Sequence, residues 1–286
     1  MLQDCKKYGL LIFTFLLLVA VAFLFYQDFQ NSHRGLTFAM LDVGQGDALF
    51  IESPTGAQIL VDLGPPRKIL SQLRRVMSPF DRTIDGIIIT NPDQDHIGGF
   101  SDVMKIYKVE SIFEPGTLTD SKTFQNLKTE VENQNIPSTL AKKGMRIHLG
   151  GGAVIDILFP DRDVFDWATN DGSVMARLTY GTTSIMLSGD ATTATEKMVL
   201  GNSSAQLKSS ILKVGHHGSR TSTSEEFVKA VSPQYALISS GKDNKYGHPH
   251  ADTLQTLERF GVKILRTDIL GTIILSCDKM GTCETN

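Results

Sequence analysis

Residues 90–99 read TNPDQDHIGG, and the apolar run GIIIT leads directly into them. This pattern predicts a buried strand, then a loop with two carboxylates and an imidazole, and finally a helix that begins beyond the two glycines. Because alternate loop positions project to one side, we expect Asn91, Asp93 and Asp95 to converge with His96. Clustered negative charges are costly unless a cation neutralises them. The stretch therefore predicts a metal site at a strand end.

Polar side chains follow three later apolar runs in the same manner. They are Asp190 after residues 184–188, His216 and His217 after 210–214, and His248 and His250 after 235–239 and a short loop. Five of the seven histidines therefore lie in loops behind strands, whereas His33 and His148 are expected to be surface residues. The recurrence predicts one functional site built from several strand ends.

The chain beyond residue 30 contains no linker, repeat or low-complexity tract, so we expect one domain over 31–286. Expected strands cover 36–43, 48–52, 58–63, 85–90, 209–214, 235–239 and 262–276, and expected hairpins cover 145–159 and 174–188. Expected helices cover 69–77, a segment after 98–99, 122–135, 193–200, 224–231 and 251–260. Two sheet-rich halves with interspersed helices predict an α/β (α+β) domain with sheets packed face to face and helices outside.

Composition and charge exclude several classes of protein. The chain has 286 residues, of which 41% are hydrophobic and 21% charged, with a net charge of −3. These values exclude a collagen, a small disulfide scaffold and a polytopic membrane protein. A strongly basic protein that wraps nucleic acid is also not expected, but a local basic groove stays open.

An uncharged segment of 20 residues, 8–27, precedes this domain. At 1.5 Å per residue it spans roughly 30 Å, which is the thickness of a bilayer's hydrocarbon core. A cleaved signal peptide, ending near Ala20-Val21-Ala22, and a buried soluble helix are the alternatives. Lys6 and Lys7 precede the segment, which places the N-terminus inside. We expect residues 1–30 to form a single-pass plasma-membrane anchor, with the domain on the extracytoplasmic side.

The cysteines bear on the compartment. Cys277 and Cys283 bracket a five-residue turn, and a disulfide between them is plausible only in an oxidising compartment. Two unrelated free thiols are the alternative. Cys5 would lie in the cytoplasm.

Taken together, these motifs resemble the metallo-β-lactamase superfamily. The resemblance rests on Asn-x-Asp-x-Asp-His at 91–96, Gly-Asp190, His216-His217-Gly-Ser and His248-x-His250. LDVGQGDA at 41–48, NDGS at 170–173 and LKVGHHGS at 212–219 narrow it to the hydrolase domain of ComEC-type competence proteins. The resemblance covers residues 36–275 and implies a four-layer αββα sandwich.

The resemblance also implies roles for individual residues. Asp95 and His96 would bind one metal, Asp190 would bridge, His216 would complete the shell, and Asp93 and Asn91 would serve a second metal. Asn170, Asp171 and His217 are further ligand candidates, and Asp42 and Asp47 would support the ligands from behind. Asp95, His248 and His250 would take part in catalysis, and Ser219 and Arg220 would contact substrate.

One position departs from the family's pattern, because Asn91 stands where the first histidine of the motif is usual. An amide oxygen is a weaker ligand than imidazole, and oxygen-rich shells favour Mn²⁺ or Mg²⁺ over Zn²⁺. We therefore expect one firm and one weak divalent metal site, filled by Zn²⁺ or Mn²⁺.

The function implied is hydrolysis of a phosphodiester, for example in single-stranded DNA, by an anchored enzyme related to DNA-uptake proteins. No obligate protein partner can be inferred. A hydrolase of small esters or β-lactams and a non-catalytic binding module with a decayed first site are the alternatives. Basic candidates for a phosphate-binding rim are Arg67, Lys68, Arg74, Arg75 and Arg220, although solvated helix and loop charges are the favoured explanation for them.

Overall fold

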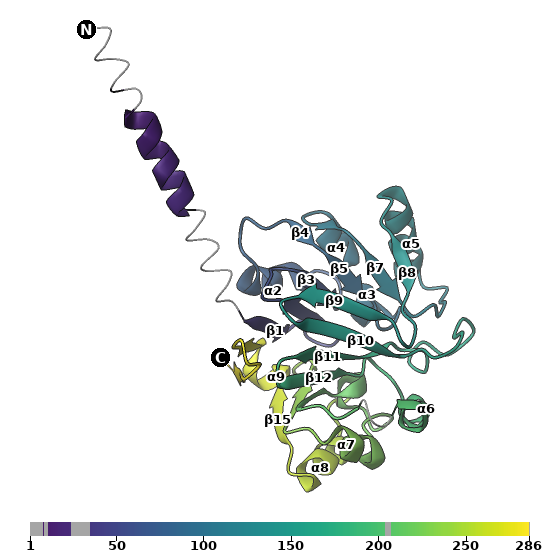
Figure 1. The fold of residues 1–286 in the computed structure, drawn as a ribbon. Helices are drawn as coiled ribbons and strands as arrows, with labels where there is room; N and C mark the ends of the chain where they lie inside the picture. The colour runs from purple at the N-terminus through teal and green to yellow at the C-terminus, as the bar shows by residue number, and fades with distance from the viewer. Residues whose placement is uncertain (1–7, 9–10, 24–34, 204–206, 286) are drawn as a thin grey trace.

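Two β-sheets stack face to face in the computed structural model, which describes residues 8, 11–23, 35–203 and 207–285 (Figure 1). The first sheet runs β17 (Cys283–Thr285), β16 (Ile273–Cys277), β1 (Leu36–Met40), β2 (Leu49–Glu52), β3 (Gln58–Val61), β5 (Gly86–Ile88), β7 (Ile112–Glu114), β8 (Ser138–Leu140). The second runs β15 (Lys263–Arg266), β14 (Tyr235–Ile238), β13 (Ile211–Lys213), β12 (Thr183–Leu187), β11 (Met175–Tyr180), β10 (Ala153–Phe159), β9 (Arg146–Gly150).

The side chains of β1 show why the domain has layers. Leu36, Phe38 and Met40 point into the core between the sheets, while Ala39 packs under the helices on the outer face. A strand buried on both faces is apolar at every position, because its side chains alternate between the faces. That explains why these strands are continuous apolar runs in the sequence.

Helices cover the outer face of each sheet (Figure 1). The first sheet carries α2 (Ile69–Val76), α3 (Gln94–Ile97), α4 (Phe100–Met104) and α5 (Lys122–Asn133). The second carries α6 (Thr193–Ser203), α7 (Glu225–Val231) and α8 (Ala251–Arg259). The expected αββα sandwich is confirmed.

Parallel pairing brings strand ends together. β3, β5, β7 and β8 pair in parallel in the first sheet, as do β12 to β15 in the second. The loops that leave the carboxyl ends of these strands therefore gather at one edge of each sheet, where open α/β sheets place their ligands.

The structure differs from the expected elements at several places, and the expected set lacks the strands β7, β8 and β17. Residues 94–97, expected as loop, form α3. The closing segment 262–276 divides between the two sheets. Its first strand, β15, pairs with β14 in the second sheet, the short helix α9 (Thr267–Leu270) follows, and β16 then pairs with β1 in the first sheet. The two-residue strands β4 (Thr83–Ile84) and β6 (Lys108–Val109) form a separate parallel pair that carries no sequence signal.

The N-terminal segment is described only in part. Residues 11–23 are helical, and their large apolar side chains are exposed, from Leu11 to Phe23. In the described part of the chain, no helix combines the length and apolarity that crossing a bilayer requires. Residues 1–7, 9–10 and 24–34, which include much of the expected anchor, lie outside the described residues, so the anchor stays a prediction.

A disulfide joins the two cysteines near the C-terminus. Cys277 ends β16, Cys283 begins β17, and the two are cross-strand neighbours. Of the two alternatives for this pair, the structure shows the disulfide; Cys5 lies outside the described residues.

Candidate metal centre

Four side chains from three strand ends meet where the edges of the two sheets touch. Asp95 and His96 lie on α3 behind β5, Asp190 follows β12, and His217 lies in η2 (Gly215–Gly218) behind β13. Asp190 Oδ2 lies 3.1 Å from His96 Nε2 and 3.6 Å from His217 Nε2. His217 Nε2 also lies 3.4 Å from Asp95 Oδ2. The ligand atoms of Asp95, His96 and His217 all fall within 4.8 Å of one another.

Several inward-facing atoms of this cluster have no hydrogen-bond partner. His96 Nε2, His217 Nε2 and Asp190 Oδ1 are buried and have no hydrogen-bond partner among the described residues, although both nitrogens lie within ion-pair distance of Asp190 Oδ2. Buried polar atoms are almost always hydrogen-bonded, so three polar atoms without a hydrogen-bond partner around one point need an explanation. Two imidazole nitrogens and two carboxylates form a donor set suited to a divalent transition metal. The residues therefore fit a divalent metal.

The far side of His96 is held by a carboxylate that the sequence analysis did not single out. Asp62 follows β3, is buried, and its Oδ2 lies 2.8 Å from His96 Nδ1. Asp62 also accepts hydrogen bonds from the Thr90 amide and hydroxyl, at 2.7 and 2.5 Å. A carboxylate behind a ligand histidine selects the tautomer and orients the ring. The signal was available, since Asp62 follows an apolar strand as Asp190 does.

His217 is held by a buried ion pair. Lys213, the last residue of β13, is 1% exposed and donates to Asp47 Oδ2 and, at 3.0 Å, to the Gly189 carbonyl. Asp47 Oδ1 in turn lies 3.3 Å from His217 Nδ1, which also lies 3.1 Å from the Ser239 carbonyl. These contacts leave His217 Nε2 directed at the cluster. Lys213 carried no role in the sequence analysis.

The loop behind β13 turns through the left-handed region at both histidines. His216 has φ 48° and His217 has φ 55°, conformations that non-glycine residues adopt rarely and mostly at functional sites. The turn directs His217 inward and leaves His216 half-buried. His216 Nε2 lies 3.8 Å from Asp190 Oδ2, and its Nδ1 contacts Thr221 Oγ1 at 3.0 Å. Between the two, the geometry favours His217 as the ligand.

The residues expected to form the second metal site bond to other protein groups. Asn91 Nδ2 donates to Asn170 Oδ1 at 2.6 Å, and Asn91 Oδ1 accepts from the Asp93 amide. Asp93 Oδ2 accepts from the Thr169 hydroxyl at 2.9 Å. A metal here would have to replace these bonds. Asn91 and Asp93 thus face the 169–170 loop, whereas Asp95 and His96 face the cluster.

The remaining expected site residues lie around the rim or support loops. His248 rests against His216, His217 and His250, with ring centres 5.6, 6.2 and 4.8 Å apart. The His250 Nδ1 accepts from the Arg220 amide, and the Arg220 side chain is exposed.

The other three fix loops. The Asp42 carboxylate accepts from Gly44 N, Asp171 accepts from the Thr192 hydroxyl, and the buried Ser219 hydroxyl contacts Thr221. None of these three contacts reaches the unpaired atoms of the cluster.

The charges in the cluster are strongly coupled. Burial alone would raise the pKa of Asp190, but the charges on His96 and His217 hold it well below its usual value. Burial alone would lower the pKa of His217, but Asp190 and Asp47 raise it to about 10. The same balance, with Asp190 and Asp62, holds the pKa of His96 well above its ordinary value. In the metal-free protein, protons on the imidazoles therefore supply the positive charge that the carboxylates require.

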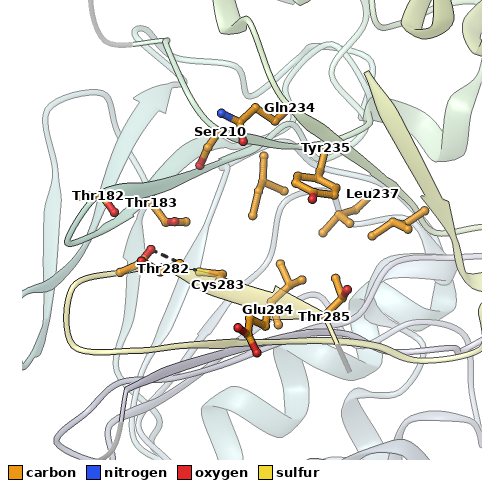
Figure 2. A pocket seen from close by; sticks show the side chains of 14 residues that line it. Thr182, Thr183, Ser210, Gln234, Tyr235, Leu237, Thr282, Cys283, Glu284 and Thr285 are labelled. Atoms are coloured by element: carbon orange, nitrogen blue, oxygen red, sulfur yellow. Dashed lines mark hydrogen bonds between the residues drawn. The ribbon is translucent and has the colours of Figure 1, made fainter. Parts of the chain in front are cut away.

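A sizeable cavity lies elsewhere. It has a volume of about 690 Å³ and opens between β17 and the starts of β13 and β14, opposite to the strand ends that carry the cluster (Figure 2). Hydroxyl-bearing residues such as Thr182, Ser210 and Tyr235 line it, and none of the unpaired buried atoms in the described residues lies there. Its chemistry gives no reason to place the reaction in it.

Replacing Lys213 tests the ion pair. Lys213→Met removes the ammonium group from the buried Asp47 carboxylate and leaves His217 as its remaining charged neighbour, so the free energy of unfolding should fall by roughly 3–5 kcal/mol. The double variant Asp47→Asn/Lys213→Met removes both charges and should recover most of that loss. Urea denaturation of the metal-free full chain measures both. Asp47→Asn alone completes the cycle, and a loss in the double variant equal to the sum of the two single losses would show that the charges do not interact.

The raised pKa of His217 predicts a proton–metal exchange. With a pKa of about 10, His217 is protonated at pH 7 and must lose that proton to present a neutral nitrogen. Metal binding at pH 7 should release at least one proton, and apparent affinity should rise with pH up to about 10. Titration calorimetry with Mn²⁺ in two buffers of different ionisation enthalpy counts the protons. His148→Ala, away from the cluster, is the control; a pH-independent affinity without proton release would contradict the prediction.

Comparison with known proteins agrees with this geometry. Residues 41–242 match the family described as the metallo-beta-lactamase superfamily. The chain is 33% identical over 258 residues to ComE operon protein 3 of Bacillus subtilis, covering 82% of this chain and 32% of that protein. It is 30% identical over 240 residues to Recombination protein 2 of Haemophilus influenzae, covering 82% and 28%. The chain thus spans about a third of the length of these relatives.

Among solved structures, the fold is shared with CmlA, a diiron beta-hydroxylase from Streptomyces venezuelae. The TM-score is 0.56 at 13% identity, over 85% of this chain and 54% of that one. Such low identity shows the fold alone. The match over 41–242 contains the strand ends behind β5, β12 and β13 that deliver the cluster, and the chain therefore belongs to the metallo-β-lactamase superfamily.

Proposed function

We propose that this domain is a metal-dependent phosphodiesterase that acts on nucleic acid. One observation carries the proposal: His96 Nε2, His217 Nε2 and Asp190 Oδ1 are buried, unpaired and gathered beside Asp95. When bound there, a divalent cation supplies Lewis acidity toward a phosphoryl oxygen and lowers the pKa of water. The superfamily assignment supports a metal-dependent hydrolase.

The chain's own residues would hold the metal and move protons. Asp95, His96, Asp190 and His217 form the binding set, with Asp62 and Asp47 fixing the imidazoles from behind. His250 can donate a hydrogen bond at the rim through Nε2, because its Nδ1 accepts from the Arg220 amide. Burial and the charge of His217 lower the pKa of His248 to about 4, so His248 is neutral near pH 7.

The proposal includes one firm metal site and one weak site. The firm site is the cluster around Asp190. The weak site involves Asn91, Asp93 and Asn170, whose side chains already bond to protein groups. The mixed nitrogen and oxygen donors accept either Zn²⁺ or Mn²⁺.

The nature of the relatives favours a phosphodiester over a small ester or a β-lactam. One relative is named a recombination protein, and another, from Neisseria gonorrhoeae, is named competence protein ComA. These names belong to whole proteins of which this chain covers about a third, and they support a nucleic-acid substrate for this proposal. A binding module with a decayed site is disfavoured, because the departure at Asn91 lies outside the set of unpaired ligand atoms.

We further propose that residues 1–30 anchor the domain at the extracytoplasmic side of the plasma membrane. The uncharged segment 8–27 behind Lys6 and Lys7 and the disulfide Cys277–Cys283 support this location.

Hydrolysis of methyl nitrophenyl phosphate and single-stranded DNA, each with Mn²⁺ or Zn²⁺, tests the activity. The wild type should cleave, and Asp190→Ala should lose at least 100-fold in kcat/KM, because the metal loses the carboxylate shared by both imidazoles. Asn91→His should bind metal more tightly, since imidazole is the better ligand. Circular dichroism checks that Asp190→Ala is folded. A silent wild type beside an active Asn91→His would favour the decayed-site alternative, and unchanged turnover in Asp190→Ala would refute the site.

Reporter fusions test the location. Alkaline phosphatase, which folds only where disulfides form, should be active when fused after Asn286, and β-galactosidase at the same position should be inactive. Cys277 and Cys283 should resist alkylation in cells until a reductant is added. The reverse pattern of reporter activity would contradict the orientation, and a mature chain that begins at Phe23 would contradict the anchor.

A further inference from the structure

A groove of about 390 Å³ opens directly beside Asp95. Four segments that are distant in the sequence form it: the β1–β2 loop, the β3–α2 loop, the start of α3 and the β14–α8 loop. Its lining residues are Gln45, Pro65, Pro66, Gln94, Asp95, Asn244, Lys245 and Tyr246. Because Asp95 belongs to both the groove and the cluster, whatever lies in the groove lies next to the candidate metal centre.

The β14–α8 side of the groove is held in one conformation. Asn244 Oδ1 accepts from the amides of Tyr246 and His248, and Asn244 Nδ2 donates to the carbonyls of Gly241 and His248. The Gln45 side chain ties this loop to the β1–β2 loop, with its Oε1 accepting from Gly241 N. Because these hydrogen bonds already order the loop, a ligand that binds to it does not incur a further entropic cost for ordering the loop.

The held loop presents an aromatic ring to solvent. Tyr246 is 53% exposed, although it lies beside the candidate centre. His248 stacks on it with ring centres 5.7 Å apart and an interplanar angle of 21°. Tyr246 is half exposed and is supported by the His248 ring. Its aromatic face is therefore a surface on which another planar group can stack.

Basic side chains lie near this aromatic surface. Lys245 Nζ lies 5.0 Å from the centre of the Tyr246 ring. Across the groove, exposed Arg67 and Lys68 follow the two prolines directly. Acidic groups also lie near: the proposed ligand Asp95 lines the groove, Asp243 is exposed on the Tyr246 loop, and Asp102 accepts from the Arg67 amide at 2.8 Å. A cation beside an aromatic face suits a ligand that alternates negative charge with planar rings.

We infer that this groove binds the nucleoside next to the scissile phosphate of a single-stranded nucleic acid, with its base stacked on Tyr246 and a neighbouring phosphate on Lys245. The inference rests on the proposed phosphodiesterase function and adds the subsite that would hold one base of a single-stranded substrate. Stacking on a protein ring requires a base that is free of its partner, and it tolerates any base because every base has a π face.

Binding of a fluorescein-labelled 12-residue oligothymidylate to the metal-free full chain in EDTA tests the groove separately from hydrolysis. Tyr246→Ala should weaken binding by about 5- to 100-fold, which is the usual loss for one stacked base. Tyr246→Phe keeps the ring and should bind within about twofold of the wild type. Phe80→Ala is the matched control, because Phe80 is an aromatic residue that is 93% exposed and lies far from the cluster. Its neighbour Asp81 bonds to Gln58, the first residue of β3, and the cluster lies at the other end of that strand.

Each outcome separates the groove from the catalytic proposal. Equal affinity in the wild type and Tyr246→Ala, or no binding by the wild type, would overturn the groove assignment. A blunt duplex that competes as well as the single strand would overturn the single-strand assignment. Tyr246-dependent binding without hydrolysis under any metal would support the groove while refuting the proposed phosphodiesterase function. Lys245→Ala should weaken binding, and the loss of affinity should be smaller at high salt than at low salt if Lys245 contacts a phosphate. An unchanged affinity in Lys245→Ala would contradict the phosphate contact.

Discussion

The carboxylate of Asp190 is buried between the imidazoles of His96 and His217, and its charge must be balanced at that depth. A lone carboxylate there would be costly, so the fold has to bring compensating groups from elsewhere. His96 comes from the first sheet, while Asp190 and His217 come from the second. The attraction between the Asp190 carboxylate and these imidazoles therefore also holds the edges of the two sheets together.

Much of the fold and the position of the site follow from one sequence pattern. Apolar runs such as GIIIT, each followed by a polar loop, indicate strands that are buried on both faces and end at a common edge. The layered sandwich and the role of the strand ends could be read from that pattern. The crossing of β16 back to β1 could not, because strand pairing is decided by contacts between distant segments.

The finer parts of the site depend on backbone conformation that the residue names do not reveal. Both histidines of the β13 loop have positive φ, and that turn rather than their identity decides that His217 faces inward. Asp62 and Lys213 look like an ordinary loop acid and a strand lysine until tertiary contacts bury them against His96 and Asp47. The partner of Asn91 is Asn170, 79 positions away, which no local pattern indicates.

The direction of β1 has a consequence for how the domain can be attached to anything else. Its first residue pairs with Cys277 at the disulfide hairpin, and the chain then runs toward Asp42 and Asp47 near the cluster. Gly35 lies so close to the Cys277 carbonyl that a side chain there would collide with it. Covalent attachment before Gly35 thus pulls on the end of the sandwich remote from the reactive edge. A polymer could approach that edge while the opposite end is tethered.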